Sequence, residues 1–445
     1  MNQWKKVKIG EFLTESKVLA EESDAAHRIT VRLNCKGVEK RGLKAEKEGA
    51  TKYYTRYAGQ FIYGKQNIHK GAFGIIPPEL DGFTSSADLP AFDIDESKCV
   101  PEWIPLCLKV DERYKTLQKE VKGVGSQRLA VNVFLNVEIP LPDVNVQRKI
   151  LAKVSKKITS IALLDDETEK QKSYAKQLRQ NILQEAIEGK LTADWRKQHP
   201  VQKGNPDYDA KALFEKIQAE KQEKGKKQKP LPVITEDEKP FAIPTSWKWV
   251  RLGDVIKEPP RNGYSPKAVD FETPIKTLKL GAITYGIFNP KEYKYINEDI
   301  PKDSYCWLKN GDILIERSNS IEYVGICAIY TGKDNEFMYP DLLMRFRTAD
   351  ILSIKYIHTA LISPFNRDYY MRNAKGAQKT MPKINQECVV NTLIPLPPLA
   401  EQNEIVARVE KYLETITQLE TQIATCETLT KQLMQGLLKD AFEER

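Results

Sequence analysis

The alternation of hydrophobic and polar positions along the chain changes to a helical spacing at two places. At each place a short apolar run ends in Ile-Pro-Leu-Pro, and a stretch with an apolar residue every three or four positions follows. The first copy, "IPLPDVNVQRKI", runs from Ile139 to Ile150, and the second, "IPLPPLAEQNEI", runs from Ile394 to Ile405. Each junction predicts the end of a strand and the start of a helix.

The apolar spacing after each junction predicts a helix of about 40 to 45 residues, roughly 60 to 68 Å long. Its apolar seam is narrow, which favours pairing with a single helix, and the other copy is the expected partner. The alternative is that each helix packs on its own lobe, but polar stretches such as "DDETEKQKS" from Asp165 argue against it. The residues expected to pair the helices are Ile150, Val154, Ile158, Ile161, Leu178, Ile182, Val409, Leu413, Ile416, Ile423, Leu433 and Leu437.

Both junctions belong to an internal repeat. Gln147 and Gln402 are 255 positions apart, and at the same offset "KQLRQNILQEAIE" recurs as "KQLMQGLLKDAFE". Upstream, "WKKVKIGEF" from Trp4 resembles "WKWVRLGDV" from Trp247, and "YAGQFIYGK" resembles "KNGDILIER". Because self-similarity at a fixed offset marks a repeated structural unit, each half of the chain reads as a globular lobe followed by a helix.

The lobes combine short apolar runs behind glycine turn signals with helical stretches, which predicts a mixed α/β (α+β) fold in two copies. Two long antiparallel coiled-coil helices are expected to join them, so that the chain has pseudo-twofold internal symmetry. A charged connector rich in lysine and proline separates the copies and contains one short predicted helix, around Ala210 to Gln222. The expected organisation is a first lobe at 1–143, a first long helix at 144–191, a linker at 192–245, a second lobe at 246–397 and a second long helix at 398–445.

Composition narrows the class of protein. The chain has 445 residues, 41% of them hydrophobic, and a net charge of +8 that is compatible with nucleic acid but is spread along the sequence. No apolar run approaches the roughly 18 residues of a membrane helix, and the first residues lack the apolar core of a signal peptide, so we expect a cytoplasmic protein with no membrane partner. The seven cysteines are scattered without a C-x-x-C pair, which indicates reduced thiols. The basic tract "EKQEKGKKQK" reads as a solvated linker, with contact to DNA as the alternative.

Motifs for catalysis are absent from the sequence. It contains neither a G-x-x-x-x-G-K-[ST] phosphate loop, nor G-x-G-x-x-G, nor the [ND]-P-P-[YF] motif of enzymes that methylate exocyclic amines. Asp88, Glu96 and Lys98 superficially match a nuclease metal site, and a restriction enzyme in its own right is the reading that they would support. The four histidines lie far apart, without a cysteine or carboxylate at ligand spacing. The chain is therefore expected to have no catalytic residues and no metal site.

The ordered, duplicated motifs resemble the specificity subunits of type I restriction-modification systems. The resemblance rests on the paired "WKKVKIG" and "WKWVRLG" lobe starts, on "GDILIER", on the two "IPLP" junctions with their glutamines, and on "EGKLTADWR" after the first helix. It covers nearly the whole chain. It implies that each lobe is a target recognition domain and that the long helices are the spacer regions of the family.

The resemblance also implies partners. The chain would read a bipartite, asymmetric target on double-stranded DNA, and would direct two modification subunits, which methylate adenine, and restriction subunits, which translocate and cut DNA. S-adenosylmethionine, ATP and Mg²⁺ are then expected on those partner subunits and not on this chain. A protein from a different class, a coiled-coil scaffold whose lobes bind proteins without recognising a DNA sequence, is the alternative.

Residues that read bases should be polar and should lie in loops next to the duplicated strand. Arginine and lysine suit guanine, asparagine and glutamine suit adenine, and other contacts position the phosphates. Two loops of each lobe have this composition: "GKQNIHKG" and "GVGSQR" in the first lobe, and "ERSNSIEY" and "KGAQKT" in the second. The residues expected to contact DNA are Lys65, Gln66, Asn67, His69, Lys70, Ser126, Gln127, Arg128, Arg317, Ser318, Asn319, Ser320, Lys375, Gln378, Lys379 and Thr380.

Overall fold

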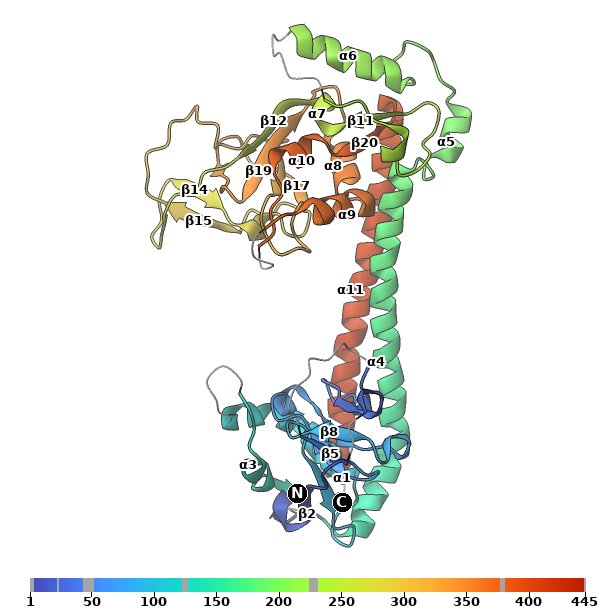
Figure 1. Cartoon of the computed structure of the whole chain (residues 1–445), viewed down its shortest axis with the longest axis vertical. Helices are drawn as coiled ribbons and strands as arrows, with labels where there is room; N and C mark the ends of the chain where they lie inside the picture. The colour runs from blue at the N-terminus through green and yellow to red at the C-terminus, as the bar shows by residue number, and fades with distance from the viewer. Residues whose placement is uncertain are drawn as a thin grey trace. The chain divides into compact units, whose positions relative to one another are not determined.

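The chain forms two compact units. The computed structural model describes residues 4–21, 24–42, 52–121, 127–223, 231–376 and 381–443. The first unit is Met1–Gln171 with Gln422–Arg445, and the second is Lys172–Thr421. The two longest helices, α4 (Val144–Ile187) and α11 (Leu399–Glu443), each contribute to both units (Figure 1).

The first lobe is built on a four-stranded antiparallel sheet. Its strand order is β2 (Leu13–Ser16), β9 (Ala91–Ile94), β6 (Phe61–Tyr63) and β7 (Phe73–Ile75). Aromatic side chains from this sheet pack on Phe134, whose ring lies 5.5 Å from that of Phe61 and 4.5 Å from that of Tyr63. Phe134 belongs to α3 (Val131–Leu135), so the helix after the last loop closes the core of the lobe.

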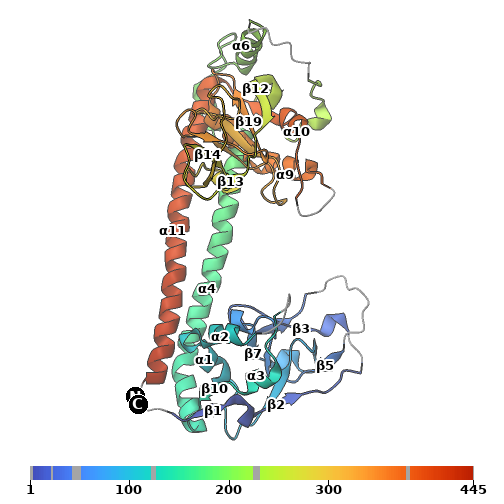
Figure 2. The same cartoon turned by 90° about the vertical axis from the view of Figure 1, so that its left-hand side faces the viewer.

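Smaller elements complete the first lobe. Strand β1 (Lys6–Lys8) pairs with β10 (Glu138–Pro140), and Figure 2 shows this pair beside α1 (Trp103–Lys109) and α4. The remaining elements are the hairpin of β3 (Ile29–Val31) and β4 (Val38–Lys40), the pair of β5 (Tyr53–Thr55) and β8 (Thr84–Ser86), and α2 (Arg113–Thr116).

The second lobe repeats this plan. Its main antiparallel sheet has the order β12 (Ile256–Asn262), β19 (Leu343–Thr348), β16 (Ile313–Glu316) and β17 (Cys327–Ile329), and β11 (Lys248–Arg251) pairs with β20 (Leu393–Leu396). The two quoted strand motifs, "GQFIYGK" and "GDILIER", therefore form β6 and β16 at equivalent places. Both begin after a glycine in the left-handed region, Gly59 with φ of 83° and Gly311 with φ of 84°, where a side chain would be strained.

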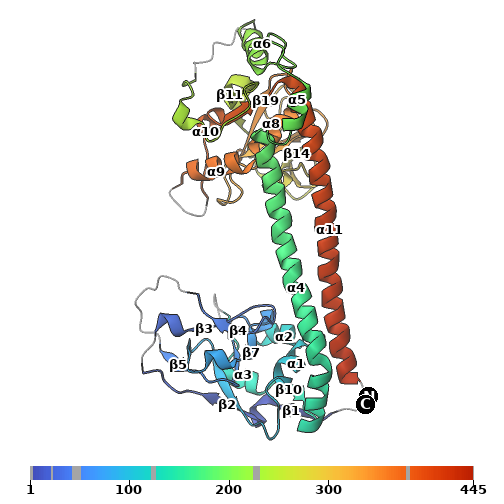
Figure 3. The same ribbon diagram turned by 90° about the vertical axis from the view of Figure 1, so that its right-hand side faces the viewer.

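The second lobe also has elements of its own. A second sheet has the order β13 (Ala268–Val269), β15 (Tyr293–Ile296), β14 (Ile275–Leu278) and β18 (Phe337–Met338). The helices α8 (Ile354–Leu361) and α10 (Gln386–Val390), labelled in Figure 3, pack on this lobe: α8 contacts β17 and β20, and α10 contacts β12. The helices of the second unit, besides its parts of α4 and α11, are α5 (Ala193–Gln198), α6 (Ala210–Glu223), α7 (Leu252–Val255), α8 (Ile354–Leu361), α9 (Pro364–Asn373) and α10 (Gln386–Val390).

The duplicated junction is explained by one buried glutamine in each copy. Gln147 Nε2 donates to Pro142 O at 2.8 Å, and its Oε1 accepts from Val100 N at 2.8 Å. Gln402 Nε2 donates to Pro397 O at 3.0 Å, and its Oε1 accepts from Ser353 N at 3.1 Å. Both glutamines are completely buried. Each one ties the first turn of its long helix to the start of a helical segment of its lobe, so the same sequence is needed twice.

The two long helices are antiparallel wherever a unit contains parts of both. In the first unit Val154, near the start of α4, shares a core with Leu438 and Ala441, near the end of α11. In the second unit Arg179, near the end of α4, forms an ion pair of 3.0 Å with Glu420 of α11. The predicted mixed fold with two lobes and a long helix pair is confirmed.

The buried seam of α4 follows a strict seven-residue repeat. Val154, Ile161, Thr168, Ala175 and Ile182 are all less than 9% exposed. On α11 the same interval separates the buried residues Val409, Ile416 and Ile423. A seven-residue repeat of buried positions is the spacing of a left-handed coiled coil.

Two of the residues expected in the seam lie outside it. Leu178 is 45% exposed and Leu433 is 56% exposed, so their predicted pairing role is wrong. Leu178 comes three positions after Ala175, and the seam uses the fourth position, which is Arg179. Ile150, Ile158, Leu413 and Leu437 are partly buried, in agreement with a position at the edge of the seam.

The linker forms the short helix that its sequence predicts, α6, which buries Ala210, Leu213 and Ile217. Residues 224–229 of the basic tract lie outside the described residues. No helix within the described ranges is both long enough and apolar enough to cross a lipid bilayer.

Candidate nucleic-acid interface

The two predicted loops of the first lobe come together after β6. Leu129 N donates to Lys65 O at 2.8 Å, and Lys65 N donates to Asp88 O at 3.0 Å. The side chain of Arg128 donates to both oxygens of Asp88, at 2.9 and 3.1 Å. The loop after the duplicated strand and the segment around residues 127–129 therefore form one surface.

The equivalent loops of the second lobe meet through the same bond. Ile384 N donates to Arg317 O at 3.0 Å, and Ile384 is 255 positions after Leu129. Ser318 is bridged to Lys383, which in turn pairs with Lys375. Each lobe thus joins the loop after its duplicated strand to the segment that precedes its last short helix, while the residues in those loops differ.

The predicted residues of the first lobe differ in how accessible they are. Gln66, Lys70 and Gln127 are exposed, and Lys65 and Asn67 are partly buried. Burial lowers the pKa of His69, and its Nδ1 is enclosed without a hydrogen-bond partner. The side chain of Arg128 is 45% exposed, but its hydrogen bonds to Asp88 hold it against the lobe. Ser126 lies outside the described residues.

In the second lobe the structure corrects one prediction and qualifies two others. Ser318 is completely buried in the bridge beside β16, so it cannot contact DNA in this conformation. Asn319 uses its amide within the lobe: Nδ2 donates to Glu316 Oε2 at 2.7 Å, and Oδ1 accepts from Ser320 N at 2.7 Å. Arg317 donates from one terminal nitrogen to Asp341 O at 3.3 Å.

The other predicted residues of this lobe lie on its surface or outside the described ranges. Ser320 is partly buried and Lys375 is exposed. Gln378, Lys379 and Thr380 lie outside the described residues.

Glu316 organises the loops of the second lobe and was not expected from the sequence. Its side chain is fully buried, and its Oε1 accepts from Thr284 Oγ1 at 2.8 Å while Oε2 accepts from Asn319. Burial raises the pKa of this carboxyl group, and the two hydrogen bonds and the charge of Arg367 oppose that rise. The equivalent residue of the first lobe is Gly64, so only the second lobe has this carboxylate.

A third loop, the tip of an inserted hairpin, joins the surface in each lobe. In the first lobe the tip is residues 32–37, between β3 and β4, where Asn34 N donates to Lys70 O at 2.8 Å and Cys35 N donates to Gly71 O at 2.9 Å. Asn34 and Cys35 both have φ near +58°, an uncommon conformation for residues other than glycine. In the second lobe the tip is residues 279–292, between β14 and β15, which Thr284 ties to Glu316. These contacts are non-local, which is why the sequence patterns missed them.

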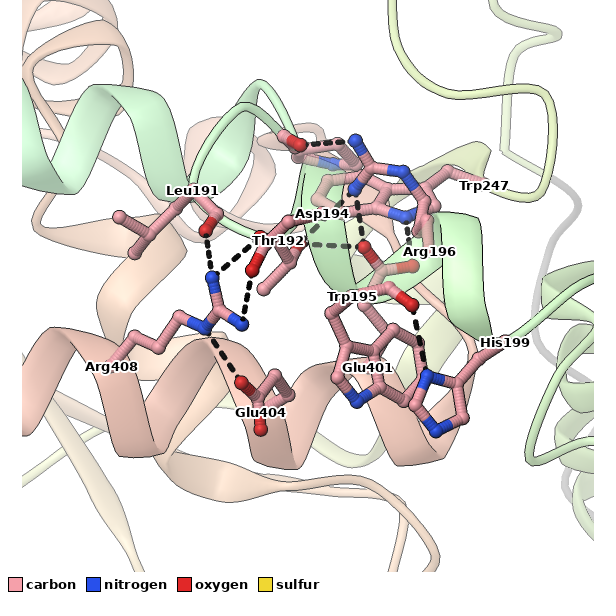
Figure 4. Close-up of polar contacts among 12 residues, drawn as sticks. Leu191, Thr192, Asp194, Trp195, Arg196, His199, Trp247, Glu401, Glu404 and Arg408 are labelled. Carbon is pink, nitrogen blue, oxygen red and sulfur yellow. Dashed lines mark hydrogen bonds and ion pairs between the residues drawn. The ribbon is translucent and has the colours of Figure 1, made fainter.

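Residues of the "EGKLTADWR" motif form a network of polar contacts with the start of α11 (Figure 4). The buried carboxylate of Glu401, at the start of α11, accepts from Thr192 Oγ1 and from Trp247 Nε1, each at 2.7 Å, and pairs with Arg196. These contacts connect the end of α4, the start of α11 and the first strand of the second lobe.

A second cation extends this network of polar contacts. Arg408 donates to Leu191 O at 2.9 Å, to both oxygens of Asp194 at 2.6 and 3.0 Å, and to Glu404 at 2.6 Å. Hydrogen bonding from Arg408 lowers the pKa of Asp194 to about 2. The motif therefore fixes how the second lobe meets its helices.

The described part of the chain contains no group of three or more histidine, cysteine, aspartate or glutamate residues placed to hold a metal ion. Asp88 is engaged by Arg128, and Lys98 pairs with Asp95 at 2.8 Å. The nuclease-like set of Asp88, Glu96 and Lys98 is therefore not assembled as a metal site.

The architecture defines a class: a two-lobed protein in which duplicated mixed α/β lobes are joined by an antiparallel pair of long helices. A solved chain with this fold comes from work on the complex assembly and conformational transition of the type I R-M system. It is 18% identical, has a TM-score of 0.59, and matches over 99% of this chain and 98% of that chain. At this identity the match concerns the fold alone.

Sequence comparisons match part of the chain to a known domain family. Residues 244–426 match the family model described as Type I restriction modification DNA specificity domain. The EcoEI and EcoAI type I restriction enzyme specificity subunits of Escherichia coli are each 30% identical over 271 residues, which are 60% of this chain but only 45% and 44% of those relatives. Residues 244–426 thus match this domain family, and the chain is similar to type I restriction enzyme specificity subunits, in agreement with the resemblance expected from the duplicated motifs.

Proposed function

We propose that this chain is a sequence-specific DNA-binding subunit that reads a bipartite, asymmetric target, with one half-site for each lobe. It would direct adenine methylation or DNA cleavage by partner subunits and carry no catalytic site of its own. S-adenosylmethionine, ATP and Mg²⁺ would be bound by those partners.

One observation carries this proposal: the two lobes share their framework but not their loops. The sheet order is the same, and the bonds from Leu129 N to Lys65 O and from Ile384 N to Arg317 O are equivalent. On that common framework the loops present different polar side chains. Two divergent reading heads in one polypeptide suit a target with two unlike halves.

Exposed apolar side chains on the long helices support the binding of partner subunits. Leu163, Leu164 and Tyr174 of α4 are 67%, 53% and 62% exposed. On α11, Leu429 is 58% exposed. Large apolar side chains of this kind are favourable contacts for another protein, and we propose that two modification subunits and restriction subunits assemble with the chain.

The test is to co-express the chain with its cognate modification subunit and to map methylated adenines across the host genome by single-molecule sequencing. The proposal expects one split, asymmetric motif with a constant gap. A stable complex that methylates no defined motif would contradict it and would favour the protein-binding scaffold.

A further inference from the structure

The tip of the second-lobe hairpin exposes two large apolar side chains that are separated in the sequence by one glycine, Gly286. Tyr285 is 84% exposed and Ile287 is 76% exposed. Few large apolar side chains of the described chain are as exposed as these, and removing such apolar surface from water is favourable. Such a pair indicates a contact with another molecule.

The backbone that carries this pair is held firmly. On one side, Ile283 is fully buried and Thr284 Oγ1 donates to Glu316. Between the pair, Gly286 N donates to Ile283 O at 2.8 Å. On the other side, Phe288 packs with its ring 4.9 Å from that of Tyr330. Thr284, Gly286 and Phe288 are thus held in the lobe. Tyr285 and Ile287, which alternate with them, are exposed to solvent in a fixed position.

The pair is continuous with the candidate interface. One carboxylate, that of Glu316, accepts from Thr284 in the hairpin tip and from Asn319 in the loop predicted to read bases. Lys291, at the base of the tip, is an exposed cation suited to phosphates, and Lys279 beside it pairs with Glu292 at 3.9 Å. In the first lobe the tip of the β3–β4 hairpin, residues 32–37, contacts Lys70 of the corresponding loop and carries Arg32, Asn34 and Lys36 beside Leu33, which is 43% exposed.

We propose that Tyr285 and Ile287 are an apolar wedge that enters a groove of the DNA and partly unstacks a base step of the second half-site. The inference rests on the proposed function and deepens it: the second lobe would select its half-site partly by how easily that DNA deforms. Apolar side chains inserted between base steps act in this way in other DNA-binding proteins. The first-lobe tip exposes a single large apolar side chain, Leu33, among polar ones, and this lobe would read its half-site mainly by hydrogen bonding.

Glu316 acts here as a positioning residue. Its carboxylate sets the distance between the wedge and the Arg317 loop, so both would reach the same stretch of duplex. Gly64 takes this place in the first lobe, where the tip is attached by backbone bonds to Lys70 and Gly71 instead.

The test uses the complete complex with the modification subunit and a duplex that contains the mapped motif, with 2-aminopurine placed in turn at each step of each half-site. Binding of the unsubstituted complex should raise the 2-aminopurine fluorescence above that of the free duplex when the probe lies at one base step of the second half-site. Tyr285→Ala with Ile287→Ala should abolish that rise and weaken binding by about 10-fold or more, the scale of losing one stacking contact. A mismatch at the same step should restore most of the lost affinity.

The matched control is Val233→Ala, because Val233 is 86% exposed but lies outside the lobe loops. It should change neither fluorescence nor affinity. Three results would overturn the wedge: no fluorescence rise in the unsubstituted complex, unchanged binding by the double variant, or loss of the modification subunit from the complex, which would make the pair a protein contact. If the unsubstituted complex methylates no motif at all, the proposed function fails before the wedge is tested.

Discussion

At the scale of single residues, the most informative side chains are buried polar groups that hold loops and helices in place. Gln147, Gln402, Glu316 and Glu401 are each at most 1% exposed and satisfy two or more backbone or side-chain partners. The sequence could identify the two glutamines because they recur at equivalent places. It could not identify Glu316, because its partners come from two segments that only the fold brings together.

The junction glutamines should stabilise their units separately. Gln147→Ala leaves Val100 N and Pro142 O without their buried partner, and we expect a loss of about 1 to 3 kcal/mol in the stability of the first unit. Gln402→Ala should have the same effect on the second unit. Hydrogen exchange of amides in β6 and in β16 distinguishes the two, and Gln180→Ala, at an exposed position of α4, is the control. Equal loss of protection in both units from one substitution would contradict this.

Glu258 should make the second lobe sensitive to acid. Burial raises its pKa, but hydrogen bonds from Arg345 and Arg347 outweigh that effect and lower the pKa from 4.5 to about 2. Because the folded pKa lies below the unfolded one, the stabilisation is complete above about pH 4.5 and is lost as the pH falls towards 2.

Glu258→Gln should therefore cost roughly 1 to 3 kcal/mol near pH 7 and progressively less as the pH approaches 3. Hydrogen exchange of amides in β19 at several pH values measures the difference between the variant and the unchanged chain. A difference that stays constant from pH 7 to pH 3 would show that the ion pairs are not its origin.

At the scale of elements, the sequence patterns correctly predicted those helices and strands that depend on interactions between residues close in the sequence. The helix starts at the two junctions, the strands "GQFIYGK" and "GDILIER" and the short helix α6 all follow from spacing and turn residues. The sheet of β13, β15, β14 and β18 was not predicted, because its short strands pair across a long insertion. The seam was predicted only in part, because the position after Leu178 is charged and still faces the partner helix.

That charged position should contribute to the register of the helix pair. Arg179 donates to Glu420 at 3.0 Å and to Thr417 at 3.3 Å. The side chain of Arg179 is 34% exposed and that of Glu420 is 42% exposed. Arg179→Glu and Glu420→Arg should each destabilise the second unit, and the double variant should recover part of the loss. A double-mutant cycle should give a coupling of about 0.2 to 1 kcal/mol, and additive effects would mean that the pair does not set the register.

At the scale of the whole molecule, the repeat provides two lobes whose loops can change independently of each other. The framework bonds are the same in both lobes, so substitutions in the loops should alter recognition without disturbing the fold. Under the proposed function, this independence would allow a duplicated framework to serve an asymmetric target. It also means that loop residues, which differ between lobes, were harder to assign from the sequence than the repeated framework residues.

If each lobe reads its own half-site, a substitution in the loops of one lobe should impair recognition of one half-site and leave recognition of the other intact. Arg317→Ala should relax or abolish recognition of one half-site, and Lys65→Ala, at the equivalent position of the first lobe, should do so for the other half. A lost base contact costs roughly 1 to 3 kcal/mol, so methylation at the affected half should tolerate substituted bases that the unchanged complex rejects. Methylated-adenine maps of the two variants measure this directly. Equal loss of specificity at both half-sites from either substitution would contradict the assignment of one lobe to one half-site. A substitution in the loop of one lobe could then alter recognition by the other lobe only through the long helices that the two lobes share.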